Sequence, residues 1–218
     1  MGRDTQNRKI KKGIRLIGKV SKYPLEAGID EAGRGCLAGP VIASAVILPD
    51  GFKIPGLNDS KKLSHKQRLI VRDAIIEQAV TWATGSASPE EIDRYNILQA
   101  TFLAMHRAIA ALKRQPRFLA IDGNHFRPYK DIPYNCFVGG DHKIASIAAA
   151  SILAKTTRDK IMEDLNKEFP GYAWDSNKGY PTVQHRQGIR KLGPSPWHRM
   201  SFKLLEEQMT LPWPQNSV

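Results

Sequence analysis

The sequence predicts an α/β protein with a central mixed β-sheet flanked by helices and a small helical subdomain at its C-terminal end. Apolar runs typical of buried strands alternate with segments whose apolar residues recur every three or four positions, as on one helix face. From about residue 170 the composition shifts to Gly, Pro, Trp and basic residues. We therefore expect a basic N-terminal arm over 1–22, an α/β domain over 23–169 and a helical extension over 170–218.

The first predicted strand, over 25–31, ends in two acids, Asp30 and Glu31, followed by the turn Gly33-Arg34-Gly35. Successive side chains of a strand point to opposite faces, so the two acids can share a site only if the strand ends or bends between them. The run 41–48 is apolar at nearly every position, which is typical of a strand covered on both faces. We expect it to pair with the first strand as a hairpin.

The next elements alternate between helix and strand. Ser64 and Gln67 form a capping box for a helix that runs to about 79, and a strand over 80–86 follows. Ser88-Pro89 then begins a helix to about 113. Its predicted core stripe is Ile92, Tyr95, Leu98, Phe102, Met105, Ile109 and Leu112.

The second half of the chain adds two more predicted strands, over 117–122 and about 134–138. A long helix follows, and its Ala148-Ala149-Ala150-Ser151 segment lets it pack closely on the sheet. In the C-terminal extension we expect short helices near 182–192 and 200–209.

Composition limits the class of protein. The net charge of +12 favours a polyanionic partner, nucleic acid ahead of an anionic membrane surface. No apolar run is long enough to cross a membrane, and the basic N-terminal residues lack the apolar core of a secretory signal. The two cysteines, Cys36 and Cys136, have no zinc-ligand spacing. We expect a cytoplasmic protein with no membrane contact.

Four acids stand at positions that bring carboxylates together. Asp30, Glu31 and Asp122 end apolar strands, and Asp141 directly precedes a helix. Such carboxylates repel one another unless they share protons or a cation, and oxygen ligands without a Cys or His pattern favour Mg²⁺ or Mn²⁺ over zinc. An acidic site on a basic surface suits cleavage of a phosphodiester between two metal ions. The residues alone thus predict a metal-dependent nuclease or phosphoryl-transfer enzyme.

Several motifs follow one another along residues 25–202. They are Asp30-Glu31-Ala32-Gly33-Arg34-Gly35, Leu37-Ala38-Gly39-Pro40-Val41, Asp59-Ser60-Lys61-Lys62-Leu63, Ile121-Asp122-Gly123, Ala148 through Lys155, Lys178-Gly179-Tyr180-Pro181-Thr182, and Pro196 through Phe202. Together and in this order they resemble the ribonuclease HII family. The resemblance implies a ribonuclease H-like fold, cleavage of RNA in RNA·DNA hybrids, and ribonucleotide removal in DNA replication and repair. It also implies incision 5′ to a single ribonucleotide in duplex DNA, leaving a 3′-hydroxyl and a 5′-phosphate.

The resemblance further implies residue roles. Asp30, Glu31, Asp122 and Asp141 match the family's catalytic and metal-binding acids. Asp159 is a rival for the fourth place, but we expect it inside a helix as the i, i+4 partner of Lys155.

The remaining roles concern the substrate, a hybrid or a DNA duplex containing ribonucleotides. In the family, Gly33-Arg34-Gly35 contacts the 2′-hydroxyl, and Tyr180 presses on the next sugar. Lys61, Lys62, Ser151 and Lys155 are expected phosphate contacts, with solvated charges as the alternative for the lysines. We expect His142 to support its loop and His198 to pack in the C-terminal region.

Two other functions remain open from the residues. One is a nuclease or resolvase of the same fold that cuts DNA only, and the other is a basic nucleic-acid-binding module without catalysis. The four acids argue against the second, and the 33–35 loop with Tyr180 argues against the first. The tail residues Gln208, Leu211 and Trp213 resemble a sliding-clamp-binding peptide, with a frayed C-terminus as the alternative. We expect a monomer.

Overall fold

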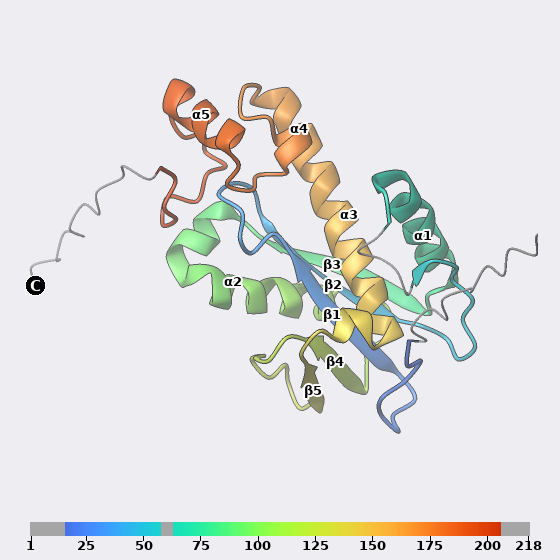
Figure 1. Cartoon of the computed structure of the whole chain (residues 1–218). Helices are drawn as coiled ribbons and strands as arrows, with labels where there is room; N and C mark the ends of the chain where they lie inside the picture. Colours follow the sequence, from blue (N-terminus) through green and yellow to red (C-terminus); the bar gives the residue numbers. More distant parts are fainter. Residues whose placement is uncertain (1–15, 58–62, 206–218) are drawn as a thin grey trace, which may run out of the picture.

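The computed structural model describes residues 16–57 and 63–205 (Figure 1). Within these ranges five strands form one sheet in the order β3-β2-β1-β4-β5. β1 pairs antiparallel with β2 and parallel with β4, which confirms the predicted hairpin and mixed sheet. The strands are β1 (Glu26–Ala32), β2 (Val41–Ile47), β3 (Thr81–Ala87), β4 (Phe118–Asp122) and β5 (Tyr134–Phe137).

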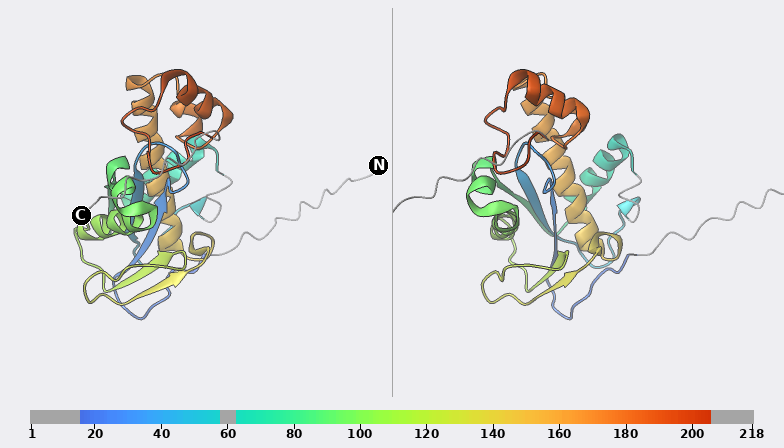
Figure 2. Two further views of the ribbon diagram at one scale, coloured as in Figure 1. Left: turned by 90° about the vertical axis from the view of Figure 1, so that its left-hand side faces the viewer. Right: turned by 60° about the vertical axis from the view of Figure 1, so that its left-hand side comes forward.

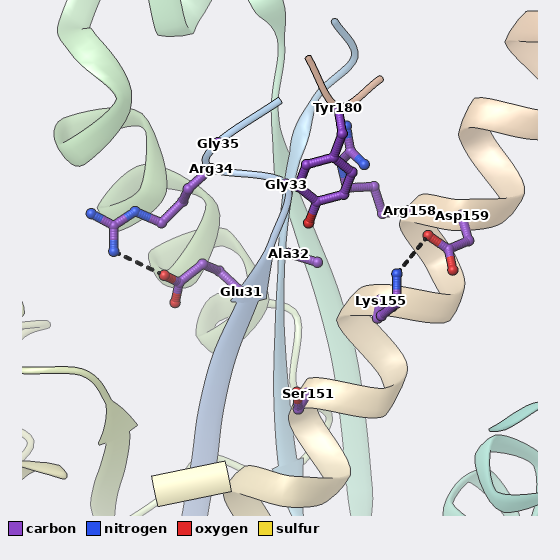
Figure 3. Close-up of a pocket in the computed structure, with 10 residues that line it drawn as sticks. All are labelled: Glu31, Ala32, Gly33, Arg34, Gly35, Ser151, Lys155, Arg158, Asp159 and Tyr180. Atoms are coloured by element: carbon purple, nitrogen blue, oxygen red, sulfur yellow. Dashed lines mark hydrogen bonds and ion pairs between the residues drawn. The ribbon is translucent and has the colours of Figure 1, made fainter. Parts of the chain in front are cut away.

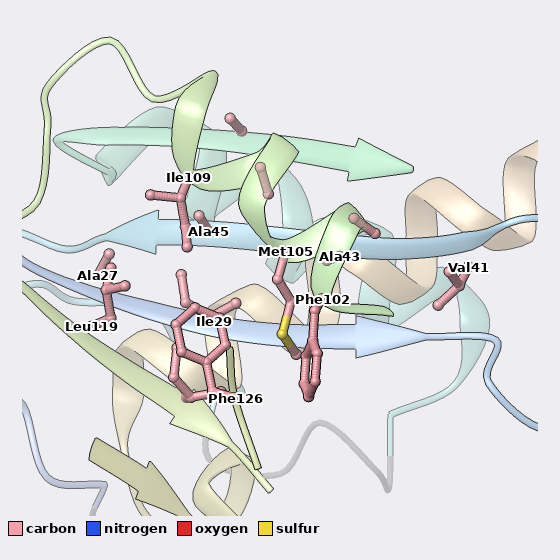
Figure 4. Close-up of a cluster of buried hydrophobic side chains, with 14 of the residues drawn as sticks. Ala27, Ile29, Val41, Ala43, Ala45, Phe102, Met105, Ile109, Leu119 and Phe126 are labelled. Carbon is pink, nitrogen blue, oxygen red and sulfur yellow. The ribbon is translucent and has the colours of Figure 1, made fainter. Parts of the chain in front are cut away.

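Helices cover both faces of the sheet. Helix α2 (Pro89–Ala110) lies on one face, while α1 (His65–Gln78) and α3 (Ala145–Glu168) lie on the other (Figure 1). Between α2 and the sheet, Ile29 of β1 packs among Phe102, Met105 and Phe126 (Figure 4). All seven residues of β2 are buried, as the apolar run predicted.

Helix α3 lies unusually close to β1. A Cβ placed on Gly28 would be only 2.1 Å from the carbonyl carbon of Ser146 and 2.3 Å from the amide nitrogen of Ile147. The absence of a side chain at Gly28 therefore permits this approach. Ala148, Ala149 and Ala150 are buried in the same layer, as expected from their small size. The close packing fixes the face of α3 that looks over the end of β1.

The predicted helix starts are confirmed, but the core stripe of α2 is wrong at two positions. Both capping boxes form, on Ser64 and on Ser88. Asn96, however, has φ 67° and breaks the helical backbone. The break changes the face that the first turn presents, so Tyr95 and Leu98 are 43% and 38% exposed instead of buried.

The C-terminal extension packs against the C-terminal end of α3 (Figure 2). It contains two short helices, α4 (Trp174–Asn177) and α5 (Val183–Leu192), gathered around the buried Trp174. The following segment, residues 194–205, which we call the C-terminal strap, returns across the sheet end to the start of α2, where Asp93 accepts from the Met200 amide. The prediction of a helix over 200–209 is wrong for residues 200–205, which form turns. The amides of Met200 and Ser201 donate to the Asp93 carboxylate instead of to helical carbonyls, and just before them the Arg199 amide donates to Leu37 O.

None of the helices in the described part of the chain is long and apolar enough to cross a membrane.

Candidate active site

Two of the predicted acids lie side by side on neighbouring parallel strands. Ile29 of β1 lies opposite Ile121 of β4, so the next residues, Asp30 and Asp122, are side by side at the carboxyl end of the sheet. Their neighbours Ile29 and Ile121 belong to the core beneath α2, so alternation directs Asp30 and Asp122 to the α3 face. Asp30 is only 6% exposed.

Glu31 reaches the same sheet end from the other face. The expectation that β1 ends or bends between Asp30 and Glu31 is wrong, because β1 continues to Ala32 and stays paired with β2. Pairing with β4 stops at Ile29, which leaves that edge of β1 open beside Glu31. Glu31 therefore lies at the open edge and lines hollows on both sides of the strand.

The fourth acid is brought in by a short 3-10 turn. Asp141 lies in η2 (Gly140–His142), directly before α3. The amide of Gly140 donates to Asp122 Oδ1 over 2.7 Å, which ties this turn to the end of β4. Asp141 is buried, with His142 Nε2 3.6 Å from its Oδ2. The fold thus gathers all four predicted acids at one end of the sheet.

Burial and mutual repulsion perturb two of these acids. Desolvation, followed by the charges of Glu31 and Asp122, raises the pKa of Asp30 well above its usual range, against the opposing hydrogen bond from Ser151. Burial also raises the pKa of Glu31, although the nearby Arg34 guanidinium lowers it in part. Arg34 holds Glu31 Oε1 at 3.1 Å. The groups around the site therefore do not fully compensate the negative charge of these carboxylates.

Two hollows meet at Glu31 and Arg34. The first, of about 290 Å³, lies toward α3; it is lined by residues 31–35 together with Ser151, Lys155, Arg158, Asp159 and Tyr180 (Figure 3). The second, of about 240 Å³, lies toward α2; it is lined by Glu31, Arg34, Leu98, Thr101, Phe102, Met105, Asp122, Gly123, Asn124 and His125. Together they form a depression across the acidic sheet end.

The expected substrate contacts on α3 share one surface of the first hollow. Ser151 and Lys155 lie one helical turn apart, and Figure 3 shows them facing β1. Lys155 Nζ is 3.2 Å from Asp159 Oδ1, which confirms the predicted i, i+4 pair. Tyr180, from the C-terminal extension, lines the same hollow and is 44% exposed.

Sequence reasoning missed two arginines that hold the 33–35 turn. Arg158 of α3 donates to the carbonyls of Ala38, Pro40 and Lys178. Arg199 of the C-terminal strap donates to other carbonyls of the same region, those of Gly33, Arg34 and Gly39. Arg199 lies within the motif over 196–202 and Arg158 lies three residues beyond the motif that ends at Lys155, but nothing local indicates that these charges are buried.

The expected packing of His198 is confirmed, whereas the support of its loop by His142 stays a prediction. His198 is buried beside Trp174 and His185, so it belongs to the C-terminal packing. His142 follows Asp141 in the η2 turn. Lys61 and Lys62, and the tail residues Gln208, Leu211 and Trp213, lie outside the described residues.

The donor set fits a hard divalent cation. Its atoms are carboxylate oxygens, and a cation would relieve the charge repulsion that, after burial, raises the pKa of Asp30. Over 16–57 and 63–205, no three Asp, Glu, His or Cys side chains already enclose a metal position. Contacts within the chain instead occupy one oxygen each of Asp30, Glu31 and Asp122.

Fold and site together define a class of protein. A mixed sheet with carboxylates at the ends of its central parallel strands, faced by a helix that carries Ser and Lys, is a ribonuclease H-like nuclease. The family model for ribonuclease HII matches residues 27–205. The chain belongs to the ribonuclease HII family.

Curated relatives and solved structures support the same family assignment. The chain is 60% identical to ribonuclease HII of Parabacteroides distasonis, over 90% of this chain and 98% of that protein. It is 55% identical to ribonuclease HII of Phocaeicola vulgatus, over 91% of this chain and all of that protein. A PCNA:RNase HII complex from Archaeoglobus fulgidus matches with a TM-score of 0.71 at 26% identity, over 85% of this chain and 98% of that one.

A more distant structure, Bst-RNase HIII in complex with Mn²⁺, shares the fold with a TM-score of 0.64 at 20% identity, over 83% of this chain and 67% of that one. The ribonuclease H-like fold predicted from the sequence is thereby confirmed. As a member of this family, the protein is a metal-dependent endoribonuclease that cleaves RNA in RNA–DNA hybrids and removes ribonucleotides.

Proposed function

We propose that Asp30, Glu31, Asp122 and Asp141 hold two divalent ions, Mg²⁺ or Mn²⁺, at the scissile phosphate of a single ribonucleotide in duplex DNA. The observation that carries this proposal is the adjacency of Asp30 and Asp122 at the carboxyl end of the sheet, where burial and then the charges of Glu31 and Asp122 raise the pKa of Asp30. When bound, the ions activate a water molecule and stabilise the leaving oxygen. The P–O3′ bond on the 5′ side of the ribonucleotide breaks, leaving a 3′-hydroxyl and a 5′-phosphate.

Selectivity for a ribonucleotide is assigned to the first hollow. Main-chain groups of Gly33, Arg34 and Gly35 contact the 2′-hydroxyl, the group that distinguishes RNA from DNA, while Tyr180 packs on the next sugar. Their common position around one hollow supports this role. Ser151 and Lys155 on the opposite wall bind the phosphates. Lys61 and Lys62 are proposed to add phosphate contacts.

The proposal assigns a different role to each of three segments of the chain. Residues 23–169 form the catalytic domain, and 170–218 form an extension that supplies Tyr180 to the substrate. The basic arm over 1–22 adds attraction to the duplex. We propose that the enzyme acts as a cytoplasmic monomer.

The test uses three labelled duplexes: all-DNA, DNA with one ribonucleotide, and a full RNA·DNA hybrid. Each is incubated with Mg²⁺, Mn²⁺ or EDTA, and the products are resolved beside size markers with defined ends. A metal-dependent nick 5′ to the single ribonucleotide, with all-DNA intact, is the expected result. Cutting of all-DNA would favour the resolvase alternative, and binding without cutting would favour the inert module.

A contact with a sliding clamp through Gln208, Leu211 and Trp213 is the second proposal. Its support is the sequence pattern, together with a solved ribonuclease HII that was captured with PCNA. Purified clamp should retain the wild-type protein and lose Trp213→Ala. Equal retention of both proteins would remove this proposal.

A further inference from the structure

The 33–35 turn rests on a buried arginine from the opposite end of the chain. The Arg199 side chain is fully buried, with no exposed surface. Its guanidinium donates to Gly33 O over 2.8 Å, to Arg34 O over 2.9 Å and to Gly39 O over 2.9 and 3.0 Å. All its hydrogen-bond acceptors are carbonyl oxygens, so the contact orients backbone instead of neutralising an acid.

This contact decides where the amides of the turn point. A trans peptide is planar, so its C=O and N–H groups point in opposite directions, and the described part of the chain has no cis peptides. The carbonyls of Gly33 and Arg34 are turned inward to Arg199. The N–H groups of the same two peptides, which belong to Arg34 and Gly35, are therefore turned outward.

The outward amides are available to a ligand. Arg34 and Gly35 are exposed, and both line the first hollow. Within 16–57 and 63–205, neither N–H group has a hydrogen-bond acceptor. Two adjacent free donors, with a buried positive charge behind them, suit an oxygen-rich ligand.

Arg158 keeps the turn in place from the α3 side. A Cβ on Gly33 would lie 2.0 Å from Arg158 Nε, so the glycine and the guanidinium are in direct contact. Gly33 also has φ +98°, a conformation that other residues rarely adopt. The turn is thus confined between two arginines and cannot easily rotate its peptides.

We propose that Arg199 is a positioning residue for ribonucleotide recognition: it aims the Arg34 and Gly35 amides at the sugar in the first hollow. This inference rests on the proposed function, because it presumes that the hollow receives the ribonucleotide. It assigns the specificity of the turn to a residue 166 positions away in the chain.

The test compares Arg199→Lys with a matched control. Lysine keeps the charge but cannot reach the three carbonyls with a planar fork. The control is Arg186→Lys, because Arg186 also donates to strap carbonyls, those of Lys203 and Leu204, away from the turn. Dissociation constants are measured in EDTA for two duplexes that differ only in one embedded ribonucleotide.

We expect wild type and Arg186→Lys to prefer the ribonucleotide duplex equally. In Arg199→Lys the preference should fall about tenfold, the value of one hydrogen bond, while the affinity for all-DNA stays within about twofold. An unchanged preference in Arg199→Lys, or an equal loss in Arg186→Lys, would overturn the inference. A wild type without any preference would overturn the proposed function as well.

A measurement on the wild type decides the case even if Arg199→Lys does not fold. Amide NMR should show fast solvent exchange for Arg34 and Gly35 in the free protein. Both signals should shift with the ribonucleotide duplex and not with the all-DNA duplex. Strong protection of both amides in the free protein would contradict their outward orientation.

Discussion

Asp30 is a carboxylate that the fold holds at a cost in stability. Burial removes its hydration, and Glu31 and Asp122 repel its charge, so its pKa is raised well above the usual range. A group whose pKa is higher in the folded chain contributes stability below its unfolded pKa, and that contribution is lost as the pH rises through the folded pKa. At neutral pH Asp30 therefore weakens the metal-free fold.

Asp30→Asn should stabilise the metal-free protein and abolish cleavage. The neutral amide removes the repulsion, and each 1 kcal/mol gained raises Tm by about 2–4 °C in a chain of this size. Binding of the hybrid should persist, because less negative charge then faces the phosphates. The measurement is a thermal melt in EDTA at pH 7, beside a cleavage assay in Mg²⁺.

Asp50→Asn is the control for this substitution, since Asp50 is exposed in a turn far from the acids in the sequence. It should leave both Tm and cleavage unchanged. Cleavage that survives in Asp30→Asn would remove Asp30 from the catalytic set.

The four acids show which features of the site could be predicted from the sequence. The carboxylates could be predicted because each lies near the end of an apolar strand or just before a helix, and strand ends meet at one edge. The face taken by Glu31 could not, because it depends on where β4 stops pairing with β1. That register is a contact between segments about ninety residues apart, which no local pattern records.

At the scale of elements, the contact between β1 and α3 sets the distance across the first hollow. Gly28→Ala would place a methyl group 2.1 Å from the α3 backbone, which has no flexible side chain to move aside. We expect a loss of about 3 kcal/mol in unfolding free energy and a fall in kcat, because Ser151 and Lys155 move away from Asp30. Urea denaturation and a cleavage assay measure the two effects.

Gly18→Ala is the matched control, because its added Cβ would meet only Phe52 Cε1 at 3.8 Å. It should change stability by less than about 0.5 kcal/mol. An equally mild effect of Gly28→Ala would show that the helix has room to adjust.

The helices of the C-terminal extension pack around two neutral histidines. Burial, and then the adjacent His185, lower the pKa of His198 to about 4. Between about 6.5 and about 4 the unfolded chain binds a proton that the folded chain excludes, so stability falls as the pH falls. The loss is at most about 1.4 kcal/mol per pH unit.

His198→Asn should flatten this dependence, since the amide oxygen can still accept from the Ser195 amide and does not titrate. Urea midpoints between pH 7 and pH 4 compare the two proteins. Equal slopes would assign the acid sensitivity to other groups.

At the scale of the whole molecule, the net charge of +12 surrounds an acidic site. Affinity for the hybrid should fall linearly with salt on a double-logarithmic plot, with a slope of about −0.9 for each phosphate neutralised. Lys155→Gln should reduce the steepness by about one such unit, while Lys160→Gln, further along α3 and exposed, should not. Equal slopes for the wild type and both variants would show that Lys155 does not contact a phosphate.

Local sequence patterns were enough to predict the helices and strands, the four acids and the family. Helix caps, apolar periodicity and strand-end carboxylates are local patterns, and the motifs lie in order along the chain. The contacts that connect these parts became visible only in the folded chain. The break at Asn96, the strap in place of a terminal helix, and the burial of Arg158 and Arg199 under the 33–35 turn all depend on long-range packing. An arginine is ordinarily a solvated charge, and only the folded chain supplies the carbonyls that make its burial favourable.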